Sequence, residues 1–140
     1  MAAALAIGLA LAAAPAAALS NAAQWLIEQE NANACIGARG RLPPEGVVEL
    51  DLTGDGRPDL LLDLGTMVCP DGSAAAGCAA AGCPLRVFVR SGDLLLPERD
   101  LIAESYQIGP QPIPVLTVTV PAGAGLWQWN GERLAFLGSL

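Results

Sequence analysis

An acidic stretch near the middle of the chain has residue types and a spacing that suit calcium. Side chains with oxygen atoms alternate at its start and recur at its end, around one glycine: Asp51, Thr53, Asp55, Gly56 and Asp59. Calcium takes about six to eight hard oxygen ligands, and alternate side chains of a tight loop can point to one centre. Gly56 permits the sharp turn because it has no Cβ. With the backbone carbonyl of Arg57 as a further ligand, the sequence predicts one calcium ion.

Two positions reduce the expected affinity. Thr53 offers a neutral hydroxyl instead of an acid or amide, and Leu62 stands where an EF-hand has its bidentate glutamate. The loop is therefore not an EF-hand, and we expect a dissociation constant of about 0.1 to 1 mM. A site for another cation or a plain turn is the alternative, because Asp side chains often accept hydrogen bonds from their own backbone.

The same stretch resembles a known kind of calcium loop. Asp51 to Asp59 is similar to the Asp-x-[Asp/Asn]-x-Asp-Gly-x-x-Asp loops of FG-GAP and VCBS-type repeats, in which a strand–loop–strand hairpin holds calcium. Leu50 to Val89 also resembles small uncharacterised secreted proteobacterial proteins, in which such a loop precedes a Cys-Gly-x-Gly-Gly-Cys-type segment, here Gly77 to Cys83. The first resemblance implies a bound calcium ion, and the second carries no established activity.

Composition argues against an enzyme. The chain has no histidine, the usual side chain for proton transfer near neutral pH, and no lysine for a Schiff base. None of its serines lies in a Gly-x-Ser-x-Gly or Ser-x-x-Lys pattern. A hydrolase that uses two of the 14 acidic residues is the remaining catalytic alternative.

The charge limits the partners. A formal net charge of −7 disfavours nucleic acid and anionic lipid, both of which need a basic surface. It favours a metal ion, a basic protein or a basic peptide. The alternative function is therefore a binding or inhibitory module that engages a basic extracytoplasmic protein through acidic loops.

The N-terminus and the cysteines both indicate export. Residues 1–18 are apolar and end in three alanines, so we expect a signal peptide there and one small periplasmic or secreted domain over 19–140. The segment lacks the usual Arg or Lys, which leaves a membrane anchor or a buried helix as alternatives. An even set of cysteines in a small exported chain predicts two disulfides. We favour Cys35 with Cys69 and Cys78 with Cys83, and the pair Cys69–Cys78 is the alternative.

The hydrophobic pattern predicts a mainly β, α+β fold. We expect one helix over 22–34, capped at Asn21, followed by an antiparallel sheet of six to eight short strands. The expected strands are 47–52, 59–64, 85–90, 94–96, 101–108 and 115–120, with a hairpin over 126–137.

Side-chain directions follow from the same pattern. Trp25 and Leu26 are expected to face the core, and Asp59 and Asp63 to point outward from their strand. Asn130-Gly131 suits a two-residue hairpin turn, which sets Trp127 opposite Leu134 and Trp129 opposite Glu132. We expect Trp127 and Trp129 to pack in the core, with a binding face for sugars or peptides as the alternative.

Overall fold

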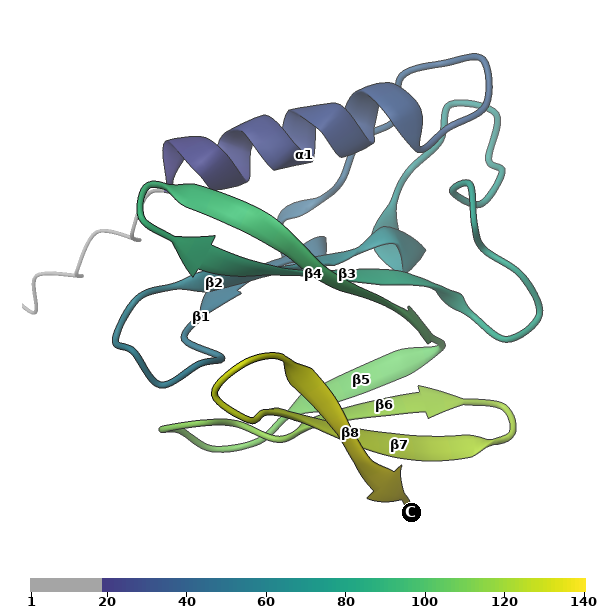
Figure 1. Ribbon diagram of the computed structural model, residues 1–140. Coiled ribbons are helices and arrows are strands. Elements are labelled where there is room, and N and C mark those ends of the chain that lie inside the picture. The colour runs from purple at the N-terminus through teal and green to yellow at the C-terminus, as the bar shows by residue number, and fades with distance from the viewer. Residues whose placement is uncertain (1–18) are drawn as a thin grey trace, which may run out of the picture.

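The computed structural model describes residues 19–140, so the expected signal peptide at 1–18 lies outside the described part of the chain. Helix α1 (Asn21–Asn33) lies over a first sheet, and a second sheet lies on the other side of the first (Figure 1). The first sheet contains β1 (Val47–Leu50), β2 (Asp59–Asp63), β3 (Cys83–Ser91) and β4 (Leu94–Ala103). The second contains β5 (Ser105–Ile108), β6 (Leu116–Val120), β7 (Gly123–Trp129) and β8 (Leu134–Ser139). Single 3-10 turns, η1 (Pro44–Gly46) and η2 (Leu64–Thr66), flank β1 and β2.

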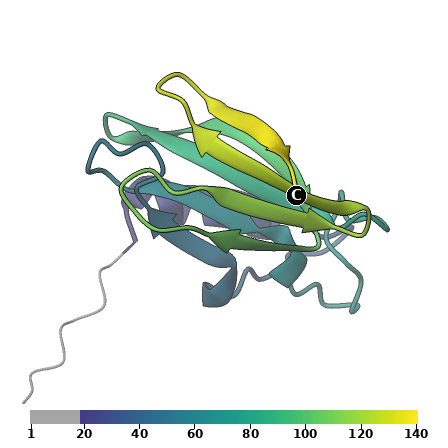
Figure 2. The ribbon, with the colours of Figure 1, turned by 90° about the horizontal axis from the view of Figure 1, so that it is seen from below.

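The predicted fold class is confirmed, and the eight strands divide into two sheets of four. Within each sheet the strands follow chain order and all neighbours are antiparallel. The division falls inside the expected strand 101–108, because β4 ends at Ala103 and β5 begins at Ser105. Glu104 makes the crossing, and its N–H donates to the Thr119 carbonyl of the second sheet (2.8 Å). Figure 2 shows the second sheet from below, with the first sheet and the helix behind it.

The first sheet is the middle layer, and its strand β2 is buried on both faces. Leu60 and Leu62 pack toward α1, whereas Leu61 packs toward the second sheet. All three side chains are fully buried. An uninterrupted apolar run of this kind is typical of a strand covered on both faces. The inter-sheet core contains Leu52, Leu61, Leu85, Val87, Leu101, Ala103, Leu116, Val118 and Leu134.

Helix α1 begins one residue earlier than expected. Ser20 is the N-cap, and its hydroxyl accepts a hydrogen bond from the Ala23 N–H (3.2 Å). The prediction that Trp25 faces the core is wrong, since the side chain is 61% exposed. The residues that contact the core include Ala23 and Leu26, and at 3.6 residues per turn Trp25 falls on the opposite side of the helix.

The expected register of the last hairpin is also wrong. Trp129 pairs with Leu134 and Trp127 with Phe136. The cause is a longer turn, because the Asn130 side chain accepts hydrogen bonds from the N–H groups of Glu132 and Arg133 (2.9 and 3.0 Å). An Asx-type turn of this kind competes with the two-residue turn that Asn-Gly favours.

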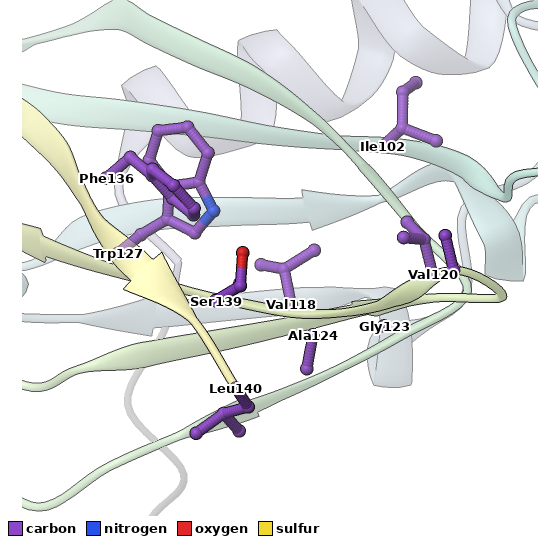
Figure 3. Close-up of a pocket in the computed structure, with 11 residues that line it drawn as sticks. Ile102, Val118, Val120, Gly123, Ala124, Trp127, Phe136, Ser139 and Leu140 are labelled. Atoms are coloured by element: carbon purple, nitrogen blue, oxygen red, sulfur yellow. The ribbon is translucent and has the colours of Figure 1, made fainter.

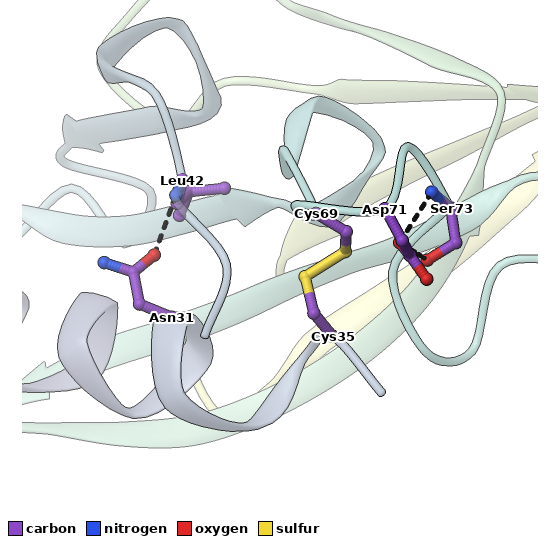
Figure 4. Close-up of a disulfide and its surroundings, with 6 residues drawn as sticks. All are labelled: Asn31, Cys35, Leu42, Cys69, Asp71 and Ser73. Carbon is purple, nitrogen blue, oxygen red and sulfur yellow. Dashed lines mark hydrogen bonds between the residues drawn. A yellow bond between two sulfur atoms is a disulfide. The ribbon is translucent and has the colours of Figure 1, made fainter. Parts of the chain in front are cut away.

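The structure contains the favoured disulfides, Cys35–Cys69 and Cys78–Cys83. The first joins the segment after α1 to the loop after η2 (Figure 4). Beside it, the side-chain oxygen of buried Asn31 accepts a hydrogen bond from the Leu42 N–H (2.7 Å). Together these contacts tie the segment between α1 and η1 to the helix and to the loop after η2.

Candidate functional site: the acidic loop between β1 and β2

The acidic loop starts after β1 and ends at the first residue of β2. Its second residue, Leu52, is 2% exposed and belongs to the inter-sheet core, so the loop is anchored between the two sheets. Gly54 and Gly56 have φ values of +78° and +82°, in the left-handed region that favours glycine. An added Cβ at Gly56 would meet no other atom, so glycine is required there by the backbone conformation and not by lack of space.

The carboxylate of Asp51 lies at the centre of the loop. It accepts hydrogen bonds from the N–H groups of Thr53 (3.1 Å), Gly54 (2.7 Å) and Gly56 (2.7 Å). Partial burial raises the pKa of Asp51, but these donors outweigh it, and the pKa lies below the usual value for an aspartate. The loop therefore curls around an ionised carboxylate.

The carboxylate of Asp59 lies inside the protein, so the prediction that it points outward is wrong. The residue is 0% exposed, and its two oxygens accept hydrogen bonds from the backbone N–H groups of Leu52 (2.8 Å) and Arg90 (2.7 Å). The physical reason is that both faces of the first sheet are covered at this end of β2, where residues 59–62 are all buried. Asp59 joins the loop to β3 at this point.

Burial raises the pKa of Asp59, although the N–H groups of Arg90 and Leu52 lower it. The nearby charges of Asp55 and Asp51 raise it further. Asp51 and Asp55 therefore lie near enough to Asp59 for their charges to disfavour its ionised form.

The remaining predicted ligands lie on the exposed side of the loop. The Asp55 carboxylate accepts a hydrogen bond from the Arg57 N–H (2.9 Å), and the Thr53 hydroxyl donates to Asp51 (3.4 Å). The Arg57 guanidinium donates to the Gly92 carbonyl in the turn between β3 and β4. Over residues 19–140, no group of three or more His, Cys, Asp or Glu side chains lies close enough together to hold a metal ion. Asp55 is exposed, Asp51 is half-buried, and Asp59 is buried beneath the loop.

A second set of contacts, centred on Arg90, has no signal in the sequence. The Arg90 guanidinium donates to the Pro58 carbonyl (3.0 Å) and to the Ser20 hydroxyl (3.0 Å). Ser20 in turn donates to the carboxylate of Glu49 in β1 (3.1 Å). The base of the acidic loop is thereby tied to the start of α1, across 70 positions of sequence. Local sequence patterns do not predict this contact, because the two residues are so far apart in the chain.

Of the two predicted aromatic residues, Trp127 lines an apolar groove formed by β4 and the second sheet, and Trp129 is not among the residues that line it (Figure 3). Trp127 is half-buried against the inter-sheet core, and its ring lies 5.1 Å from that of Phe136. The Arg99 guanidinium lies over the same indole at 5.1 Å from its centre. The groove has a volume of about 350 Å³ and includes Val118 and Leu140 among its walls.

Comparisons of the chain with protein-family models, with curated proteins and with solved structures found no match. Within residues 19–140, no helix is both long enough and apolar enough to cross a membrane.

Proposed function

We propose that this protein is a non-catalytic exported domain whose loop Asp51–Asp59 binds one structural calcium ion. The observation that carries the proposal is the placement of three acids on one tight loop: Asp51 and Asp55 lie above the buried carboxylate of Asp59, and their negative charges repel it. A divalent cation relieves that repulsion. The two disulfides support export, because disulfides persist in oxidising compartments.

The donor atoms suit a hard cation. Asp51 and Asp55 supply carboxylates, Thr53 a hydroxyl and Arg57 a backbone carbonyl, all of them oxygen ligands of the kind calcium prefers. Asp51 accepts its backbone hydrogen bonds and keeps further lone pairs for an ion. Asp59 contributes negative charge from below, where its oxygens already hold the backbone.

The position of the loop explains what an ion would do. A Cβ added at Gly54 would lie 2.8 Å from Ile113, in the segment between β5 and β6, so the loop tip lies against that segment. Leu52 enters the inter-sheet core, and Arg57 reaches the β3–β4 turn. An ion that holds the loop in one conformation therefore stabilises the contact between the two sheets.

The test is a thermal melt of the oxidised chain with excess calcium and with chelator. At 100 times its dissociation constant a bound ligand adds about 2.7 kcal/mol to the free energy of unfolding, which raises Tm by several degrees. We expect this rise to be lost in Asp55→Asn and kept in Asp71→Asn. Asp71 is the matched control because it is also an exposed aspartate in a turn, with hydrogen bonds to Ser73. No rise in Tm at about 10 mM calcium would make the loop an ordinary acidic turn.

The distribution of charge supports a second candidate, a module that binds a basic protein. Residues 19–104 contain 13 acidic side chains and six arginines, whereas residues 105–140 contain one of each. The whole net charge therefore lies on α1, the first sheet and their loops. Binding of a polylysine peptide that weakens as salt rises from about 50 to 300 mM, and weakens in Asp55→Asn, would favour this candidate. Absence of binding at the lower salt concentration would rule it out for this surface.

A further inference from the structure

The second sheet is electrically neutral, in contrast to the rest of the described chain. Its strands and turns, residues 105–140, carry Glu132 and Arg133 as their charged side chains, both in the β7–β8 turn. A sheet face exposed to water ordinarily carries charged residues, which keep copies of a protein apart. Here the charges that produce mutual repulsion all lie on the other half of the molecule.

Strand β8 is an edge strand without the usual protection. The other edges are short or interrupted: β1 and β5 have four residues each, and β4 contains Pro97 and the charged run 98–100. Natural proteins use short length, proline and charge in this way to prevent pairing between edges. Residues 134–140, by contrast, contain neither a proline nor a charged side chain.

Apolar side chains on and beside β8 remain exposed. Phe136 and Leu137 are 53% and 54% exposed, and Leu140 is 80% exposed. The apolar groove adjoins them, and none of the side chains that line it in the described structure is charged (Figure 3). Most other exposed apolar side chains of the described residues, such as Leu94 beside Asp93, belong to the acidic first half.

We propose that β8 and the adjoining groove form a self-association surface, and that its occupant is a second copy of this chain. A charged partner would find no opposite charge along the groove. Two copies that meet at β8 join strands without charged side chains. The twofold axis of antiparallel pairing is perpendicular to the joined sheet, so the two acidic halves lie on the same face of it, one on each side of the axis, and repel each other. Antiparallel pairing of β8 with its copy is isologous, so each Leu137 lies near the symmetry axis and the two second sheets join into one.

The geometry of β8 indicates where the pairing falls. The Leu134 N–H already donates to the Glu98 carboxylate of β4 (2.8 Å), so the N–H of the first residue of β8 is not available to a second copy. The ladder to β7 shifts between Leu126 and Trp127, and Leu137 has no partner there. The segment from Phe136 to Ser139 is therefore the part available to a second copy.

The test is sedimentation velocity of the oxidised full chain in chelator, from about 1 to 500 µM. We expect a concentration-dependent dimer that tightens when salt rises from about 50 to 500 mM, because salt screens the repulsion between acidic halves. Leu137→Glu should weaken the dimer at least tenfold, since it places two like charges near the axis. Leu94→Glu is the matched control, a similarly exposed leucine at the first residue of the edge strand β4, and should leave the dimer unchanged.

A cross-linking experiment provides a second readout that does not require a charge. All four native cysteines are paired, so Leu137→Cys adds one free thiol. Mild oxidation should convert this variant, but not Leu94→Cys, to a covalent dimer. A wild-type chain that stays monomeric up to about 500 µM would overturn the proposal, as would a dimer that survives Leu137→Glu or is lost equally in Leu94→Glu.

Discussion

At the scale of single residues, Asp59 is the acid whose position matters most for the fold. Its carboxylate is fully buried and accepts one hydrogen bond from the loop and one from β3. Hydrogen bonds to a buried charged acceptor contribute about 1.5 to 3 kcal/mol each, and burial of the charge offsets part of that. Asp51 accepts more hydrogen bonds, but all of them come from its own loop, so its effect is confined to the loop.

We expect Asp59→Asn to lower the free energy of unfolding by about 2 to 4 kcal/mol. An amide keeps one acceptor oxygen and places an NH2 group against a backbone N–H, so one buried donor loses its partner. Urea denaturation in chelator measures this without any contribution from calcium. The exposed variant Asp93→Asn should change stability by less than about 0.5 kcal/mol. If Asp59→Asn cost as little as the control, the two hydrogen bonds of the buried Asp59 carboxylate would not stabilise the fold.

At the scale of elements, the two disulfides constrain segments of very different length. Cys35–Cys69 joins residues 34 positions apart, and both cysteines are buried beside Met67 and Leu42. Cys78–Cys83 closes a loop of five positions at the start of β3. Since the entropy removed from the unfolded chain grows with the length of the closed loop, the first should stabilise the fold more than the second.

We expect the double variant Cys35→Ala/Cys69→Ala to cost about 4 kcal/mol and Cys78→Ala/Cys83→Ala about 2 kcal/mol, from the chain-entropy relation. Urea denaturation of the two variants, each with its other disulfide intact, measures the difference. Equal costs would show that the restriction of the unfolded chain is not the main contribution of these bonds.

At the scale of the whole molecule, the strands of the middle sheet contribute side chains to two cores, one on each face. Leu60 and Leu62 serve the core under α1, and Leu61 serves the core between the sheets. Loss of either core exposes the same strand, so the described layers should unfold together. The single residue between β4 and β5 gives the same expectation, since the two sheets are continuous in the chain.

We expect Leu116→Ala to cost about 2 to 5 kcal/mol, because the side chain is fully buried between the sheets. Trp25→Phe, at an exposed position of α1, restricts tryptophan fluorescence to β7, so fluorescence and far-UV circular dichroism can then be compared in one chain. The two probes should give coincident transitions, with and without Leu116→Ala. Separate transitions would show that the second sheet unfolds independently.

Much of the architecture could be predicted because it depends on local pattern. The alternation of Leu116, Val118 and Val120 predicts β6, and the cysteine spacing favours the observed disulfides. In the acidic loop, the glycines at the two left-handed positions and the backbone-capping role of Asp51 also follow from local chemistry.

What the sequence determined by itself was the set of elements, because hydrophobic period and turn residues act within a few positions. Tertiary structure alone decided that Asp59 lies inside, that Trp25 lies outside and that the strands divide at Glu104. These outcomes depend on which second layer covers each face. A pattern of alternating residues shows that a strand has an apolar face, but it does not show whether the polar face meets water or another part of the chain.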